Sequence, residues 1–185
     1  IVALGAGKDL RMYHNGTNSI IQNYTGDLSI RNGADDGDII FDCDDGSGGL
    51  ETYFFLDGSA SSGNPITIFP DLSALYFGTG TDLMIRHDGT DSTIANNGGD
   101  LYITQNTNDK DIVFKCDDGS GGTATYFYLD GSEAGSGYLF TRFPDNSLAT
   151  FGDSHDLQIY HDSGNSHILN YTGDLNIVNY ADDKD

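Results

Sequence analysis

The sequence is poor in the residues that bind phosphate and in those that span membranes. Lys and Arg together number 8 against 29 Asp and Glu, which gives a formal net charge of −21. A surface of this sign repels nucleic acid and anionic lipids, because phosphate binding needs cations that displace counterions. No apolar run approaches the roughly 18 residues of a membrane-spanning helix. We therefore expect neither nucleic acid nor a membrane among the partners of this chain.

Residues that favour helices are also scarce. Glu51 and Glu133 are the only glutamates, so almost all of the acid is Asp, which favours turns and caps. The chain instead holds 25 Gly, which suits tight turns, and 11 Tyr and 10 Phe, which suit strands. Two cysteines are too few for a disulfide scaffold. This composition predicts an all-β fold of short strands joined by tight turns.

An internal repeat organises the sequence. The dipeptide Asp9-Leu10 returns after 73 residues and again after a further 74. Residues 1–58 and 74–131 are identical at more than half of the aligned positions, which indicates a tandem duplication. The chain divides into copy 1 (residues 1–73), copy 2 (residues 74–147) and copy 3 (residues 148–185).

The outer copies are incomplete by comparison with copy 2. Copy 1 lacks the opening residues of the repeat, and the chain starts without Met. Copy 3 stops at Asp185, which corresponds to Asp111, the residue directly before a predicted strand of copy 2. We therefore expect the chain to be part of a longer array.

Apolar and polar residues alternate over short segments within each copy. Leu83, Ile85 and His87 are predicted on one face of a strand, with Met84 and Arg86 on the other. Strands are predicted to begin near residues 75, 83, 92, 101, 112, 125 and 138, with Gly or Asp at almost every boundary. The inward residues of such strands form the predicted repeat core, which consists of Leu10, Leu83, Ile85, Ile94, Leu101, Ile103, Ile112, Phe114, Leu157 and Ile159.

Each predicted strand offers only two or three inward residues, so one copy cannot bury a core by itself. A copy must stack on neighbouring copies or pair with other chains. The predicted fold is therefore an elongated tandem-repeat fibre. It is either an intertwined trimeric β-fibre or a single-chain β-solenoid, and separate globular β modules are a third alternative.

One histidine recurs in every copy, as His14, His87 and His161. Each ends an apolar face and directly precedes a turn. Two roles are open for these residues. In a threefold fibre the equivalent imidazoles would meet at the axis and could bind a transition metal. Alternatively, each imidazole is structural and hydrogen-bonds the adjoining turn.

An acidic, glycine-rich loop recurs as residues 42–49 and 115–122, and it contains the aspartate pairs Asp44-Asp45 and Asp117-Asp118. Clustered carboxylates could bind calcium, but the spacing does not match the EF-hand loop. The loops are either hairpin turns or weak cation sites. Apart from weak Ca²⁺ binding, we expect no cofactor.

Cys43 and Cys116 occupy the same position of a predicted strand, and we interpret them as small buried residues, with a disulfide between copies or chains as the alternative. The sequence contains no Ser-His-Asp elbow, phosphate-binding loop or zinc spacing. The recurrent aspartates lie beside glycines at turns, which suits a role in local geometry. We therefore expect no enzymatic activity.

Four segments of copy 2 resemble repeats in tail-fibre and other virion structural proteins of marine cyanophages and related phages. They are residues 75–78, 82–89, 92–94 and 99–103. Copies 1 and 3 carry the same elements, although Ser163 stands where the others have Gly. The resemblance implies a trimeric virion appendage with a role in host recognition, and it identifies no catalytic residue.

The sequence therefore predicts a structural repeat of a phage tail fibre or another virion appendage, which provides length and stiffness. Its expected partners are further copies of itself, other virion proteins and host-surface glycans. Two alternatives remain open. One is a repeat of a secreted bacterial adhesin or extracellular filament at the cell surface, and the other is a glycan-cleaving fibre.

Overall fold

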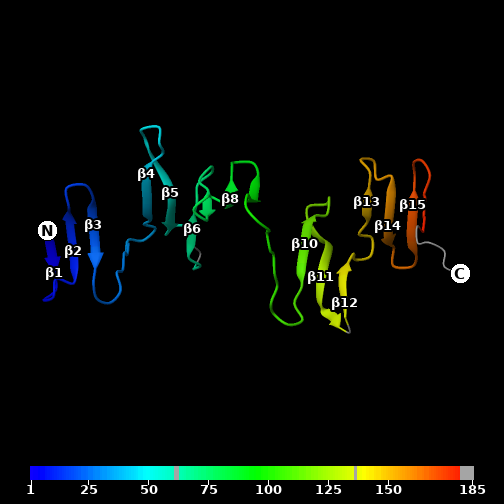
Figure 1. The fold of residues 1–185 in the computed structure, drawn as a ribbon, viewed down its shortest axis with the longest axis horizontal. Helices are drawn as coiled ribbons and strands as arrows, with labels where there is room; N and C mark the ends of the chain where they lie inside the picture. The colour runs from blue at the N-terminus through cyan, green and yellow to red at the C-terminus, as the bar shows by residue number, and fades with distance from the viewer. Residues whose placement is uncertain (61–62, 136, 180–185) are drawn as a thin grey trace. The chain divides into compact units, whose positions relative to one another are not determined.

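The computed structural model describes residues 1–60, 63–135 and 137–179, and the fold is all-β (Figure 1). The described residues form five antiparallel sheets of three strands each and contain no helix. The chain divides into two compact units, Ile1–Leu101 and Tyr102–Asp185. The first unit holds three of the sheets and the second holds two. The predicted all-β class is confirmed.

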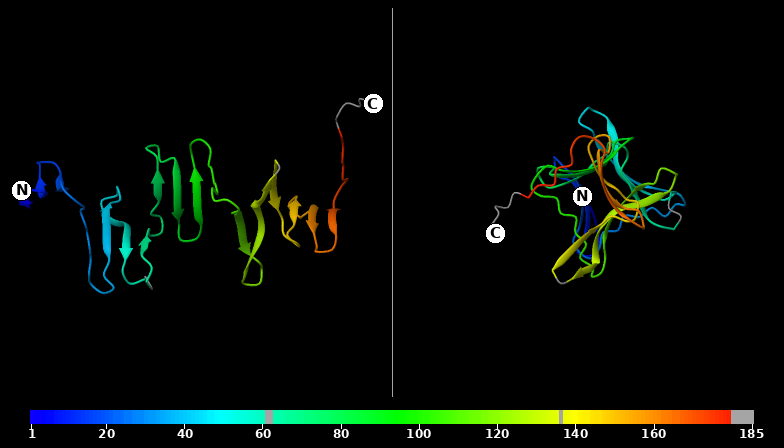
Figure 2. Two further views of the ribbon diagram at one scale, coloured as in Figure 1. Left: turned by 90° about the horizontal axis from the view of Figure 1, so that it is seen from below. Right: turned by 90° about the vertical axis from the view of Figure 1, so that its right-hand side faces the viewer.

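Three of the sheets carry the recurrent histidine, and we call them the histidine sheets. Each is a meander in which the middle strand pairs antiparallel with the strand before it and the strand after it. Figure 2 shows the second of them in green in its left-hand view. The histidine sheets consist of β1 (Val2–Leu4), β2 (Leu10–His14) and β3 (Ser19–Asn23); β7 (Leu75–Phe77), β8 (Leu83–His87) and β9 (Ser92–Asn96); and β13 (Ala149–Phe151), β14 (Leu157–His161) and β15 (Ser166–Asn170).

The other two sheets carry a row of phenylalanines, and we call them the phenylalanine sheets. In the first, the register shifts between Phe41 and Asp42, so that Tyr53 is an extra residue on the facing strand. The Tyr53 hydroxyl donates to the carbonyl of Asp44 over 2.9 Å, which holds the bulge to the last residue of the preceding strand. The phenylalanine sheets consist of β4 (Ile39–Asp44), β5 (Leu50–Asp57) and β6 (Ile66–Ile68); and β10 (Ile112–Asp117), β11 (Thr123–Gly135) and β12 (Tyr138–Arg142).

A side-chain acceptor closes the turn after the middle strand of each histidine sheet. Asp88 Oδ1 accepts the N–H groups of the residues two and three positions later, at 3.1 and 2.9 Å. Asn15 and Asp162 accept the same two bonds in the other histidine sheets. The residue after the acceptor has a positive φ, which is 97° at Gly89 and 76° at Ser163. Glycine adopts this conformation without strain, whereas serine does not.

An asparagine fixes the direction in which the chain leaves each histidine sheet. Asn96 Nδ2 donates to the carbonyls of Gly98 (3.0 Å) and Gly99 (2.9 Å). Asn23 and Asn170 make the equivalent pairs of bonds. The side chain therefore replaces the backbone partners that these carbonyls would need if the chain continued as a hairpin.

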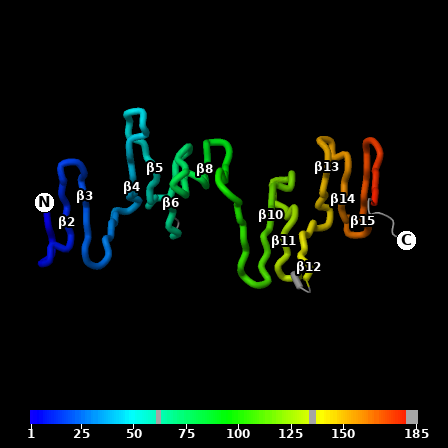
Figure 3. The backbone as a smooth tube through the Cα atoms, viewed as in Figure 1, coloured from blue at the N-terminus to red at the C-terminus, as the bar shows by residue number. Residues whose placement is uncertain are grey.

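Six of the predicted strands are confirmed, namely those near residues 75, 83, 92, 112, 125 and 138. The strand predicted near residue 101 is wrong for the single chain, because residues 101–106 belong to no strand. Figure 3 traces this segment between β8 and β10. Alternation makes a strand only where a partner edge is available, and beyond Asn96 the chain does not fold back on β9.

None of the described apolar residues is buried, and Asp130 is the one buried residue among those described. Among the described residues of each unit, contacts between strands occur only within a sheet, so no second layer of the same unit covers a sheet face. Of the predicted core, Leu10, Leu83, Ile112 and Leu157 are half-buried; Ile85, Ile94, Leu101, Ile103, Phe114 and Ile159 are exposed. Burial of this core within one chain is thus not observed, and its burial in an assembly stays a prediction.

Candidate interaction surfaces

One face of each histidine sheet is apolar. In copy 2 the register places Leu75, Ile85 and Ile94 in one row across the three strands, and Phe77 and Leu83 in the next. Both rows project from the same face, because side chains alternate along a strand. Ile94 is 65% exposed. The equivalent rows are Val2, Met12 and Ile21 with Leu4 and Leu10; and Ala149, Ile159 and Ile168 with Phe151 and Leu157.

The opposite face of the same sheet has a different chemistry. The register pairs Tyr76 with Met84, and Arg86 with Thr93. The guanidinium Nη2 of Arg86 lies 3.7 Å from a carboxylate oxygen of Asp88. This face therefore combines a phenol, a cation and a hydroxyl, and it suits water far better than the apolar face does.

The phenylalanine sheets also leave an apolar face uncovered. The rings of Phe41, Phe54 and Phe69 stack across the first sheet, with centroid separations of 4.5 and 5.7 Å. The second sheet repeats both spacings with Phe114, Phe127 and Phe143. The outer rings of each row are exposed. All five sheets thus present an apolar surface that no described strand of the same unit covers.

The two cysteines accompany the phenylalanine rows. Cys43 follows Phe41 by two residues on β4, and Cys116 follows Phe114 by two residues on β10, so each thiol shares a face with its phenylalanine. Both thiols are free and exposed. The interpretation of these cysteines as buried residues is therefore wrong for the single chain, because no layer packs on this face.

The three recurrent histidines each bond a serine on the facing strand. His87 Nδ1 lies 3.1 Å from Ser92 Oγ, and the same contact is 3.4 Å at His14 and 3.2 Å at His161. All three imidazoles are exposed, and each lies on its own sheet. The structural alternative named the adjoining turn as the bonding partner, whereas the observed partner of Nδ1 is this serine. Within the first unit, His14 and His87 lie on separate sheets and bond different serines.

The acidic loops fold their carboxylates back on their own backbone. Asp45 Oδ1 accepts the N–H and the hydroxyl of Ser47, both at 2.7 Å. These two bonds from Ser47, the hydroxyl first, lower the pKa of Asp45, and Ser120 lowers the pKa of Asp118 in the same way. Asp44 and Asp117 accept the N–H of the residue two positions later. Across the described ranges, no three His, Cys, Asp or Glu side chains are grouped to hold a metal ion.

An acid–imidazole pair that sequence reasoning missed lies in copy 3. His167 Nε2 is 2.8 Å from Asp162 Oδ2, and its ring stacks on Tyr160 with a centroid separation of 4.7 Å. The N–H of Asn165 and then the His167 side chain are the main causes that lower the pKa of Asp162 to about 2. The feature that could have indicated this pair is the β14–β15 register, which places His167 opposite Tyr160 and beside the turn.

A second missed pair joins β11 to β12. Asp130 Oδ2 lies 2.6 Å from Arg142 Nε, while its other oxygen accepts the hydroxyl of Ser132 (2.8 Å) and the N–H of Glu133 (3.0 Å). These contacts, with the Ser132 hydroxyl first, lower the pKa of Asp130. The site is specific to copy 2, because Ile68 of copy 1 corresponds to Arg142.

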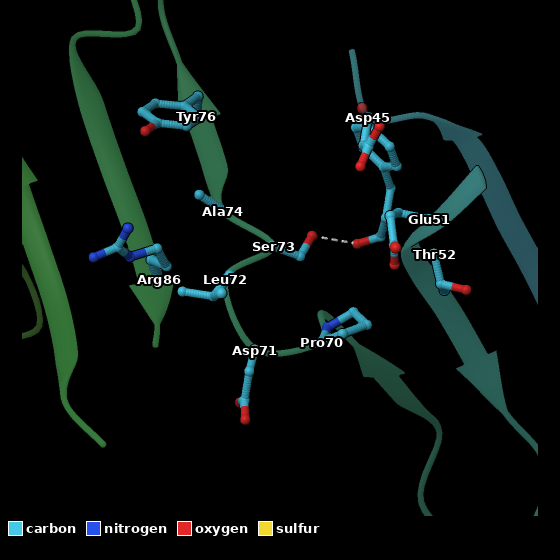
Figure 4. A pocket seen from close by; sticks show the side chains of 11 residues that line it. Asp45, Glu51, Thr52, Pro70, Asp71, Leu72, Ser73, Ala74, Tyr76 and Arg86 are labelled. Carbon is cyan, nitrogen blue, oxygen red and sulfur yellow. Dashed lines mark hydrogen bonds between the residues drawn. The ribbon is translucent and has the colours of Figure 1, made fainter. Parts of the chain in front are cut away.

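A groove of about 650 Å³ lies between β5 and the segment that joins β6 to β7 (Figure 4). The Ser73 hydroxyl donates to the carbonyl of Tyr53 over 2.5 Å and holds this segment against β5. Glu51 lies on one side of the groove, and Tyr76 and Arg86 lie on the other. Phenol rings, a carboxylate and a guanidinium along an open groove can hydrogen-bond and stack on a polyhydroxylated ligand.

No protein-family model matches this chain, and no curated protein or solved structure is detectably similar to it. The described residues include no helix that could cross a lipid bilayer.

Proposed function

We propose that this chain is a structural repeat segment of an extracellular fibre, and that it acts in a phage tail fibre or another virion appendage. The observation that carries the proposal is the apolar face on every sheet, together with the absence of any buried apolar residue among those described. Such faces are stable in water only when another surface covers them. The fibre would supply length and stiffness in proportion to the number of repeats.

The exposed area supports self-association. The chain has an accessible surface of 14913 Å². Two separate compact domains of half its mass would together expose about 10,500 Å². A standard interface buries about 800 Å² on each partner. The difference is large enough for several such interfaces on one chain.

An assembly of three chains fits these apolar sheet faces best. Three sheets can enclose a common axis so that each apolar face meets the other two, which gives a closed assembly. The resemblance of residues 75–78 and 82–89 to tail-fibre repeats supports the same number and a place in the virion. The alternative assignment, a repeat of a bacterial adhesin or extracellular filament, would use the same faces in the same way.

We also propose that the groove beside Ser73 contacts glycans of the host surface. It opens beside Tyr76 and Arg86, which belong to the polar face of their sheet, so an assembly through the apolar faces leaves it accessible. We propose no catalytic step there, because Asp45 accepts bonds from its own loop, and a fibre that only binds needs none.

The mass in solution tests the main proposal. Light scattering should give three times the chain mass for the wild type. Ile94→Asp places a charge on the apolar face and should yield monomers, whereas Thr93→Asp places the same charge on the opposite face, across from Arg86, and should leave the trimer intact. A monomeric wild-type chain would contradict the proposal.

A further inference from the structure

The segment that follows each histidine sheet has the pattern of a strand but joins no strand among the described residues. In copy 2 this segment is residues 101–104, where Leu101 (49% exposed) and Ile103 (67% exposed) alternate with Tyr102 and Thr104. Copies 1 and 3 repeat the pattern with Leu28 and Ile30, and with Leu175 and Ile177, all of them exposed. We call these the trailing segments.

The backbone of the trailing segments makes no strand ladder with any described residue. The N–H groups of Leu101, Ile103 and Thr104 donate to no backbone carbonyl of the described residues. Water can satisfy these groups, but it leaves the apolar side chains exposed as well. A partner strand would satisfy the backbone and cover Leu101 and Ile103 together.

The adjacent edge of the same chain is not used. Asn96 holds the carbonyls of Gly98 and Gly99, and Gly99 has a φ of 66°. The chain leaves the sheet at this turn instead of returning along β9. Strand β9 therefore keeps an open edge, since among the described strands it pairs only with β8.

We propose that the trailing segments add as strands to the open edges of histidine sheets in a second copy of this chain. Each histidine sheet is followed by one trailing segment, so a self-assembly supplies donors and acceptors in equal number. The inference rests on the proposed self-association and names the backbone pairing within it.

The charge distribution favours pairing between two copies of this chain. The chain as a whole carries −21, yet residues 101–104 contain no Asp, Glu, Lys or Arg, and neither does β9. These two elements can approach without the repulsion that acts between the acidic turns. Alternation keeps Leu101 and Ile103 on one side of the added strand, and the register that places this side with Leu75, Ile85 and Ile94 would extend their apolar face.

Amide hydrogen exchange of the assembled wild-type protein tests the pairing. We expect the amides of residues 101–105 to exchange at least about tenfold more slowly in the assembly than in the Ile94→Asp chain, because ladder bonds must open before exchange. Equal exchange in the two proteins, with the wild type assembled, would overturn the inference and leave the proposed function standing. A wild type that never assembles would overturn both.

Proline substitution gives a second measurement. Successive N–H groups of a strand point to opposite edges, so either Ile103→Pro or Thr104→Pro must remove a donor that faces the partner. One of the two should shift the midpoint of assembly to at least about tenfold higher protein concentration. Ile103→Val keeps the donor and serves as the control. Neither proline removes a backbone ladder bond within the described chain, so loss of folding is not expected. Unchanged assembly in both proline variants would contradict the pairing.

Discussion

The imidazole Nδ1 of His87 lies 3.1 Å from the hydroxyl of Ser92 across the β8–β9 ladder, and the same pair recurs in each histidine sheet. Both side chains share the apolar face with Ile85 and Ile94, at the end next to the turn. The pair therefore joins the two strands where the apolar rows stop. Its recurrence supports the structural alternative for these histidines, which stays a prediction.

This role predicts that Gln replaces His87 with little loss, because it keeps a donor and an acceptor. His87→Leu should cost about 0.5–1.5 kcal/mol of the free energy of unfolding, since the pair is exposed and its net bond energy is modest. Urea denaturation of the wild type and both variants provides the measurement. Equal losses for Gln and Leu, matched by a chelator acting on the wild type, would instead support metal binding.

Acid should weaken the contribution of Asp162. Its pKa is lowered from 3.8 to about 2 in the folded chain, so its carboxylate stabilises the fold at pH values above 3.8. This stabilisation should be lost as the pH falls through the range between these values. The free energy of unfolding of the wild type should exceed that of Asp162→Asn by a constant amount above about pH 5, and the gap should close toward pH 2. A gap that does not change with pH would show that the carboxylate's charge is irrelevant.

A side chain at position 58 should be poorly tolerated. A Cβ on Gly58 would lie 2.6 Å from the carbonyl oxygen of Gly37, and the Gly58 N–H donates to Asp38 over 2.9 Å. We expect Gly58→Ala to cost about 1–3 kcal/mol of unfolding free energy. The control is Gly33→Ala, where nothing lies within 4 Å, and it should change stability by less than about 0.5 kcal/mol. Thermal unfolding of the two variants gives the comparison, and similar losses would refute the steric argument.

Salt should stabilise the protein through screening. Asp44, Asp45, Asp117 and Asp118 gather like charge in small exposed loops of a chain with a net charge of −21. The midpoint of thermal unfolding should therefore rise with ionic strength, and Ca²⁺ should act no better than Mg²⁺ at equal concentration. A sharp increase at micromolar Ca²⁺, absent with Mg²⁺, would establish a true calcium site in these loops.

The free thiols should report assembly. Cys43 and Cys116 lie on the faces that carry the phenylalanine rows, and both are exposed in the single chain. If those faces meet in the assembly, maleimide should label the wild-type protein more slowly than the monomeric Ile94→Asp variant. Mass spectrometry of the labelled peptides measures each cysteine separately. Equal rates would show that the phenylalanine faces remain open to solvent.

Most of the strands could be predicted from segments of alternating apolar and polar residues that begin and end near Gly or Asp. Leu83, Ile85 and His87 lie on one face as expected, because a period of two sets the direction of each side chain. The bulge at Tyr53 was not predictable, since an inserted residue of this kind leaves no mark in a hydrophobic pattern.

The sequence was less informative about partners. Residues 101–103 carry a strand pattern, but a pattern does not say which edge a strand will meet, and these residues join no strand of the described chain. The Asp162–His167 pair escaped notice because it depends on cross-strand register and on a substitution in one copy. The expectation that one copy cannot bury a core agrees with the exposed rows around Ile85.

Every ladder in the described chain joins strands that are neighbours in sequence, and no register crosses from one sheet to another. The gene can therefore gain or lose a whole repeat by recombination without disturbing the pairing of those that remain. Length would change in discrete steps while the contacts within each sheet stay constant. A population of related chains that differ in repeat number, with otherwise similar copies, is the evolutionary outcome that this local pairing allows.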